Sequence, residues 1–120
     1  MGIALVVEDS LTEREIISQC LKQAGLSVSI AASGEEALEK LNNQLPDVIV
    51  LDVVLPGRSG FEICRAIKAE GRTSQIPIII CSTKNTEMDK FWAKKQGADA
   101  YEIKPIDQTT FVNTVQQLIN

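Results

Sequence analysis

An aliphatic run that ends on a single carboxylate constrains the fold of this chain more than any other feature. Residues 48–51 are Val-Ile-Val-Leu, and Asp52 follows directly. An unbroken aliphatic run is typical of a parallel strand that is buried on both faces. Open α/β sheets place their ligand crevice at the carboxyl ends of such strands. Asp52 is therefore either a reactive group at that crevice or a strand-end carboxylate that meets solvent.

Length, charge and hydropathy exclude several classes of protein. A chain of 120 residues has room for one domain with one core. Its net charge of −4 argues against sequence-independent binding to nucleic acid, which needs a basic face. No apolar run is as long as a membrane span, and no basic segment precedes residues 3–7 as it would in a signal peptide. We expect a cytoplasmic protein that binds no nucleic acid and inserts into no membrane.

The cysteine and histidine counts limit the chemistry further. Cys20, Cys64 and Cys81 are widely spaced and odd in number, so we expect reduced, mostly buried thiols. The sequence contains no histidine, which excludes Cys/His zinc sites and catalysis by a histidine base. A metal would have to be held by oxygen ligands, which favours Mg²⁺, Mn²⁺ or Ca²⁺.

Strand and helix patterns alternate along the whole chain. Strands are expected at residues 3–7, 26–31, 47–52, 78–81 and 100–103. Capping boxes at Ser10, Ser33 and Ser59 begin the first three helices, a fourth helix runs from about Thr86 to Gln96, and Asp107 caps the last.

Five strands that alternate with five helices predict a parallel sheet with helices on both faces. Right-handed crossovers favour the doubly wound, flavodoxin-like α/β fold with strand order 2-1-3-4-5. We expect residues 1–120 to form one domain, with nothing left over for an output domain.

Polar residues follow four of the five predicted strands. They are Glu8 and Asp9, Asp52, Ser82 and Thr83, and Lys104. The carboxyl ends of parallel strands share one edge, so the three carboxylates should converge. A divalent cation would relieve their repulsion, and Mg²⁺ suits a site of few carboxylates completed by water and substrate oxygens. A single acidic strand end beside a lysine is often only a surface ion pair, and the joint occurrence on several strands favours the reactive interpretation.

This constellation supports phosphoryl transfer to a carboxylate. Asp52 would attack phosphorus in line and form an aspartyl phosphate. Glu8 and Asp9 would hold Mg²⁺ directly or through water, while Lys104 and Ser82 would each contact a phosphoryl oxygen.

The same residues resemble the receiver domain of response regulators, of the stand-alone, chemotaxis-type (CheY-like) kind. The matching positions are Glu8-Asp9-Ser10, Asp52, Leu55-Pro56-Gly57, Gly60, Ser82-Thr83, Gly97-Ala98, Tyr101 and Lys104-Pro105. The segment from Ser82 to Pro105 is most similar to regulators of twitching-pilus and phototaxis systems.

The resemblance implies a role for each residue of the site. Asp52 would accept a phosphoryl group from a histidine kinase, with Lys104 and Ser82 assisting. The implied metal ligands are Glu8, Asp9, Asp52 and the backbone carbonyl of Val54.

The resemblance also implies how the phosphate is read out. Ser82 would bond the phosphoryl group and Tyr101 would turn inward, so that the surface of the fourth helix, fifth strand and fifth helix changes shape. This surface would then control a downstream protein in chemotaxis, phototaxis or pilus motility. A monomer or a weak dimer is expected.

Two residues depart from the usual pattern of the family. Glu8 stands where Asp is usual, and Ser82 is the smaller of the two usual hydroxyl residues. Val54 and Lys84 occupy positions that set the dephosphorylation rate, and Val54 has no polar group to orient water. We therefore expect slow self-hydrolysis and no enzyme activity on other substrates.

Other interpretations remain open at this point. A haloacid-dehalogenase-type phosphatase also uses a strand-end Asp, but it normally needs a second acid where this chain has Val54. A flavodoxin-like flavin or nucleotide binder would need a phosphate-cradling loop where Glu8-Asp9-Ser10 stands. A receiver-like scaffold that is never phosphorylated, or a sink that drains phosphate from a shared kinase, is the remaining alternative.

Three large apolar side chains, Met88, Phe91 and Trp92, lie close together in the fourth predicted helix. Their spacing favours core and half-buried packing. The alternative gives Trp92 an exposed edge that docks a partner.

Overall fold

The five strands form one parallel sheet in the predicted order β2-β1-β3-β4-β5. The computed structural model describes residues 2–119. Its strands are β1 (Gly2–Val7), β2 (Leu26–Ala31), β3 (Val48–Asp52), β4 (Ile78–Ser82) and β5 (Ala100–Ile103). Its helices are α1 (Leu11–Gln23), α2 (Gly34–Leu41), α3 (Gly60–Ala69), α4 (Glu87–Lys95) and α5 (Gln108–Ile119). The predicted doubly wound α/β fold is confirmed.

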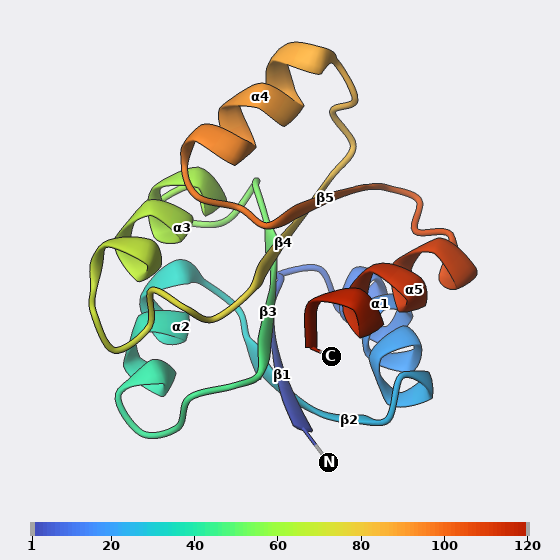
Figure 1. The fold of residues 1–120 in the computed structure, drawn as a ribbon, viewed down its shortest axis with the longest axis horizontal. Helices are drawn as coiled ribbons and strands as arrows, with labels where there is room; N and C mark the ends of the chain where they lie inside the picture. The colour runs from blue at the N-terminus through green and yellow to red at the C-terminus, as the bar shows by residue number, and fades with distance from the viewer. Residues whose placement is uncertain (1, 120) are drawn as a thin grey trace.

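Helices cover both faces of the sheet (Figure 1). On one face α1 and α5 pack against the strands through residues such as Ile17 and Phe111. On the other face α2 and α3 contribute Leu41 and Ile63 to a second cluster. All five residues of the central strand β3 are buried, which is why its sequence is an unbroken aliphatic run up to Asp52.

The capping box predicted at Ser59 is complete in the structure, and a second complete box begins α4. The Ser59 hydroxyl accepts a hydrogen bond from the Glu62 backbone N–H at 3.3 Å, and the Glu62 carboxylate accepts one from the Ser59 N–H at 3.2 Å. Thr86 and Asp89 form the same reciprocal pair at the start of α4. These pairs satisfy backbone donors that the first turn of a helix leaves free.

The capping boxes predicted at Ser10 and Ser33 are only half formed. Each serine accepts a hydrogen bond from the N–H three residues later, but the return bond is missing. Glu13 lies instead 3.7 Å from Lys104, and Glu36 accepts from the Ala32 N–H. In both cases the acid of the sequence pattern has a partner other than the backbone N–H of the capping serine.

A glycine brings the start of α3 against the end of β3. The Gly60 N–H donates to the Val53 carbonyl at 2.8 Å. A Cβ atom at Gly60 would lie 2.0 Å from the Asp52 carbonyl oxygen, closer than any side chain can approach. Only glycine therefore allows the turn after Asp52 to close in this way.

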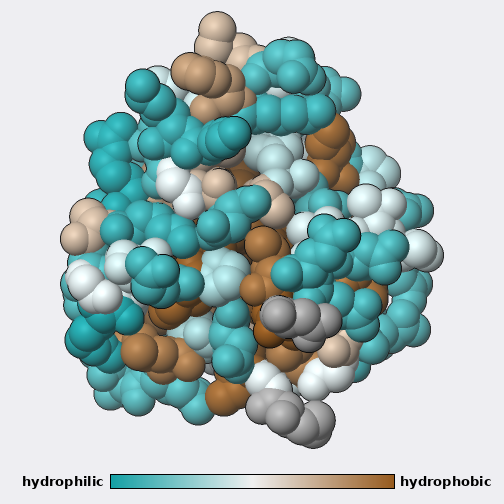
Figure 2. All heavy atoms as spheres, in the orientation of Figure 1, coloured by the Kyte–Doolittle hydropathy of each residue, from teal (hydrophilic) through white to brown (hydrophobic). Residues whose placement is uncertain are grey.

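Helix α4 is only lightly attached to the body of the molecule (Figure 1). Of its residues, all of which the structure describes, only Ala93 is buried. Met88, Phe91 and Trp92 are 71%, 59% and 45% exposed. The prediction of core or half-buried packing for these three is wrong, because α4 packs against the core only through Ala93. Figure 2 shows apolar side chains at the top of the molecule, over α4.

Among residues 2–119, none of the helices is both long and apolar enough to cross a membrane. The three cysteines are free and buried, as predicted.

Candidate functional site

Three carboxylates converge at the carboxyl edge of the sheet. Glu8 and Asp9 follow β1, and Asp52 is the last residue of β3. Oxygens of the three side chains all lie within 4.8 Å of one another. The strands β1 and β3 are neighbours in the sheet, with Val7 opposite Leu51, so both end at the same level. The predicted convergence of the acids is confirmed.

Lys104, which follows β5, reaches into the centre of the acidic cluster. Its Nζ lies 2.8 Å from Glu8 Oε1 and 3.4 Å from Asp52 Oδ2. The lysine side chain is only 9% exposed, so these ion pairs are screened little by water. Burial lowers the pKa of Lys104, but the hydrogen bond to Glu8 and the surrounding carboxylates outweigh it and raise the pKa above its ordinary value. Lys104 therefore stays charged.

Glu8 is buried and both of its carboxylate oxygens are engaged. Oε1 pairs with Lys104, and Oε2 accepts a hydrogen bond from the Ser10 backbone N–H at 3.1 Å. Its backbone carbonyl accepts from Arg14 Nε at 2.7 Å. Asp9, in contrast, is exposed. Glu8 thus anchors the lysine and the start of α1, while Asp9 is the acid that is accessible from solvent.

The carboxyl group of Asp52 is held in an environment that disfavours its charge. Burial raises its pKa most; Lys104 lowers the pKa and Glu8 raises it, and the net result is a pKa of about 6 against an ordinary 3.8. A weak hydrogen bond from the Val54 N–H, 3.4 Å from Oδ1, supports the charged form. A strongly shifted acid beside a specific cationic partner is a mark of functional sites.

Ser82 and Tyr101 are connected through the backbone of Lys84. The Ser82 hydroxyl is buried at the end of β4 and accepts a hydrogen bond from the Lys84 N–H at 3.1 Å. The Tyr101 hydroxyl, from β5, donates to the Lys84 carbonyl at 2.7 Å. Ser82 and Tyr101, for which the sequence predicted a joint role, therefore both bond to the backbone of Lys84 in the loop after β4.

Val54 lies next to the cluster with its side chain 69% exposed. Its N–H contacts Asp52, as described above, and the role of its carbonyl as a metal ligand stays a prediction.

The residues present fit a hard divalent cation. The donor set consists of carboxylate oxygens, which Mg²⁺ and Ca²⁺ prefer. Asp52 is buried with a raised pKa, so a nearby cation would stabilise its charged form. The exposed Asp9 leaves one side of the cluster open to solvent.

The structure gives two residues, Glu13 and Lys84, contacts that the sequence did not predict. Glu13 was interpreted only as a capping residue, yet its carboxylate lies 3.7 Å from Lys104 Nζ. Lys84 contributes through its backbone, which no sequence pattern reports. Both depend on contacts between residues far apart in the chain, and a local motif does not carry that information.

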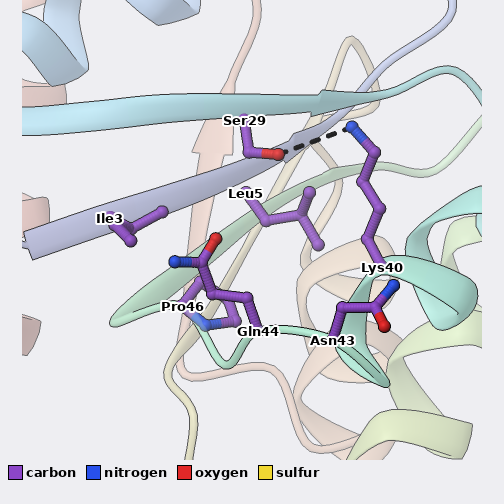
Figure 3. A pocket seen from close by; sticks show the side chains of 7 residues that line it. All are labelled: Ile3, Leu5, Ser29, Lys40, Asn43, Gln44 and Pro46. Carbon is purple, nitrogen blue, oxygen red and sulfur yellow. Dashed lines mark hydrogen bonds between the residues drawn. The ribbon is translucent and has the colours of Figure 1, made fainter.

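A separate hollow of about 220 Å³ lies near the opposite, amino-terminal edge of the sheet (Figure 3). Ile3, Ser29 and Pro46 contribute to its wall. Lys40 points across it, with Nζ donating to the Ile30 carbonyl and lying 3.5 Å from the Ser29 hydroxyl. The ammonium is already bonded, and the hollow contains none of the acids described above.

The sequence of this chain is similar to those of known proteins. The family model described as response regulator receiver domain matches residues 4–116. The chain is 37% identical to protein PilH of Pseudomonas aeruginosa over 119 residues, which are 99% of this chain and 98% of PilH.

The chain is also similar to solved structures of a response regulator and a receiver domain. The chemotaxis response regulator CheY4 of Vibrio cholerae is 34% identical, with a TM-score of 0.91 over 98% of both chains. The receiver domain of the sensor histidine kinase PA1611 from Pseudomonas aeruginosa is 26% identical, with a TM-score of 0.89 over 98% of this chain and 97% of that one. That crystal structure has a magnesium ion coordinated in its active-site cleft.

Proposed function

The chain belongs to the response regulator receiver domain family of two-component systems, and from this membership we propose that Asp52 accepts a phosphoryl group from a histidine kinase. The observation that carries the proposal is the position of Asp52, a buried carboxylate with a raised pKa, between Lys104 and two further acids. The sequence pattern, the fold and the geometry of the cluster all support it.

Mg²⁺, when bound, would neutralise the charge that develops on the phosphoryl oxygens during transfer. The proposed ligands are Asp9, Asp52, Glu8 directly or through water, and the backbone carbonyl of Val54. The cluster of acid oxygens within 4.8 Å supports this assignment, as does the magnesium ion in the cleft of the PA1611 receiver domain.

Asp52 is the nucleophile in the proposed transfer. A pKa of about 6 leaves most of the carboxylate ionised at neutral pH, so no separate base is needed. An Asp52 oxygen forms a bond to phosphorus while the phosphorus–nitrogen bond of the kinase phosphohistidine breaks, and imidazole leaves. Lys104, already 3.4 Å from Asp52, would pair with a phosphoryl oxygen.

The proposed readout runs through Ser82 and Tyr101. When the Ser82 hydroxyl bonds the phosphoryl group, it leaves the Lys84 N–H, and the loop after β4 moves. The Lys84 carbonyl moves with it, so Tyr101 loses its present acceptor and changes position. A phosphate that favours the new packing by a few kcal/mol is sufficient to act as a switch.

The proposed output is the surface of α4, β5 and α5, with a downstream protein as the partner. Tyr101 lines a hollow of about 240 Å³ between α4 and β5, together with Lys90 and Lys94. A shift of Tyr101 would therefore alter this surface directly. The similarity to PilH supports a role in motility, and we propose pilus motility, chemotaxis or phototaxis as the behaviour controlled.

We further propose that the protein acts in the cytoplasm and is not an enzyme on other substrates. Its three free, buried thiols agree with a reducing compartment. The exposed side chain of Val54 offers no polar atom beside Asp52 to orient water, which supports slow hydrolysis of the phosphoryl group.

Intact mass spectrometry after incubation with acetyl phosphate tests this function. We expect wild type to gain one phosphoryl group, about 80 Da, only when Mg²⁺ is present. The Asp52→Asn variant, matched in size, should gain nothing. An unmodified wild type, under conditions that label another receiver domain, would leave a receiver-like scaffold as the better account.

A further inference from the structure

A groove of about 440 Å³ separates α3 from α4. One wall is a face of α3 that includes Arg65, Ala66 and Ala69, and the other wall is formed by Trp92 and Gln96. The groove extends along α3 for about 12 Å, at 1.5 Å per residue from residue 61 to residue 69. It lies on a different side of α4 from the hollow next to β5, so it is separate from the proposed output surface.

A buried amide group lines this groove without a complete set of partners. Gln96, which follows α4, is only 5% exposed. Its Oε1 accepts a hydrogen bond from Arg65 Nε at 2.7 Å, which fixes the orientation of the amide. Its Nε2 finds no acceptor among the described residues. The Nε2 atom is itself shielded from solvent, so the amide contributes to the groove by holding Arg65 in place, not as an open donor.

The groove carries positive charge in a protein whose net charge is −4. Arg58 and Arg65 are both exposed, and neither guanidinium forms an ion pair with any carboxylate in residues 2–119. The only acid in the lining, Glu62, is bonded to the Ser59 N–H as part of the helix cap. Two guanidiniums without a carboxylate partner favour an anionic ligand.

The remaining surface of the groove is apolar. Trp92 is 45% exposed, and the small side chains of Ala66 and Ala69 leave room opposite it. Tryptophan and arginine are the residues most enriched at the centres of protein interfaces. The surface therefore combines an apolar contact with anion recognition.

We propose that the groove between α3 and α4 binds an extended acidic peptide segment of a partner protein. Carboxylates would pair with Arg58 and Arg65, and an apolar side chain would pack on Trp92. The length of about 12 Å accommodates about four extended residues at 3.3 Å each. A peptide supplies the negative charge and the apolar group together.

Fluorescence of Trp92, the only tryptophan of the chain, provides the test. The probe is a pool of acetylated, amidated pentapeptides in which Asp or Glu fills one or two positions and Leu or Met fills the rest. The matched pool has Asn and Gln in place of the acids. We expect a saturable change in emission with the acidic pool, with a midpoint below about 1 mM, and none with the neutral pool.

Variants locate the binding. Ala69→Phe, at an exposed position, should fill the groove and raise the midpoint by about tenfold or more. Arg58→Gln should raise it about threefold to tenfold, and Lys22→Gln, which removes one charge on α1, should leave it unchanged. The assay contains no phosphodonor, so its result is independent of the proposed function.

Four results would overturn the proposal. They are no saturation by about 1 mM, equal binding of the neutral pool, a midpoint that Ala69→Phe does not change, and an emission change that depends on protein concentration alone. The last result would assign the groove to a second copy of this chain.

Discussion

At the residue scale, a single lysine lies within the cluster of three carboxylates. Lys104 lies between Glu8 and Asp52 and lowers the pKa of Asp52, but burial, together with the charge of Glu8, outweighs it and leaves that pKa raised. The charged form of Asp52 is therefore less stable in the folded protein than in the unfolded chain. This cost is what a bound cation or a phosphoryl group with its counter-ion would remove.

The raised pKa of Asp52 predicts how the stability of the protein depends on pH. The folded state takes up a proton as the pH falls through about 6, before the unfolded chain does. The stability due to this group is thus present at pH below about 4 and is lost as the pH rises through about 6, with a total of at most about 3 kcal/mol.

Asp52→Asn should consequently be more stable than wild type at pH 7.5, by about 1–3 kcal/mol, and equally stable near pH 4. Urea unfolding without divalent cations measures both values. Glu39→Gln, at an exposed position on α2, serves as control and should change stability by less than about 0.5 kcal/mol at either pH. An equal effect of Asp52→Asn at the two pH values would contradict the account of this site.

The sequence predicted that the charged residues of the site lie together. It did not predict that Glu13 also contacts Lys104. Glu8, Asp9 and Asp52 lie at the ends of strands that share one edge of the sheet. Their closeness could therefore be predicted from the strand patterns and the strand order. Glu13 has the spacing of a capping residue, and only the position of Lys104 in three dimensions gives it another partner. A contact across the fold leaves no local signal.

At the element scale, the loop between β3 and α3 positions the carboxyl group of Asp52. Ser59 caps α3, and Gly60 allows its first turn to contact the Asp52 carbonyl. The sequence predicted the cap at Ser59, since a capping box has a local signature. The reason for glycine at position 60 could not be predicted, because it depends on how closely two backbones approach.

Gly60→Ala should destabilise the protein by about 2–4 kcal/mol, because its Cβ would lie 2.0 Å from a backbone oxygen. It should also slow phosphorylation of Asp52, since the end of β3 has to move. Gly71→Ala is the matched control: a Cβ there meets nothing within 4 Å, so stability should stay within about 1 kcal/mol of wild type. Denaturant unfolding compares the two, and similar effects would refute the close-approach explanation.

At the scale of the whole molecule, α4 is the element that the sequence described least well. Its boundaries were predicted closely, but its apolar residues were expected to be half-buried or packed in the core. Helical spacing shows that a helix has an apolar face, and it does not show whether the fold covers that face. Here the face stays exposed, so it is available to a partner.

Two phenylalanines distinguish the exposed helix from the core. Phe111→Ala should cost about 3–5 kcal/mol, because Phe111 is fully buried against the sheet. Phe91→Ala should change the stability by less than about 0.5 kcal/mol, because Phe91 is 59% exposed. Thermal or urea unfolding of both variants checks the prediction. A large loss of stability in Phe91→Ala would contradict the exposed position of Phe91 on α4.

The central claim is that a phosphoryl group on Asp52 changes the surface of α4, β5 and α5. Hydrogen exchange tests it most directly, with Mg²⁺ and beryllofluoride, which mimics a phosphoryl group on a carboxylate. We predict altered exchange in residues 83–106 of wild type, a smaller change in Tyr101→Phe, which lacks the hydroxyl that contacts Lys84, and none in Asp52→Asn. Exchange that is altered only around Asp52, or altered equally in Asp52→Asn, would contradict the account.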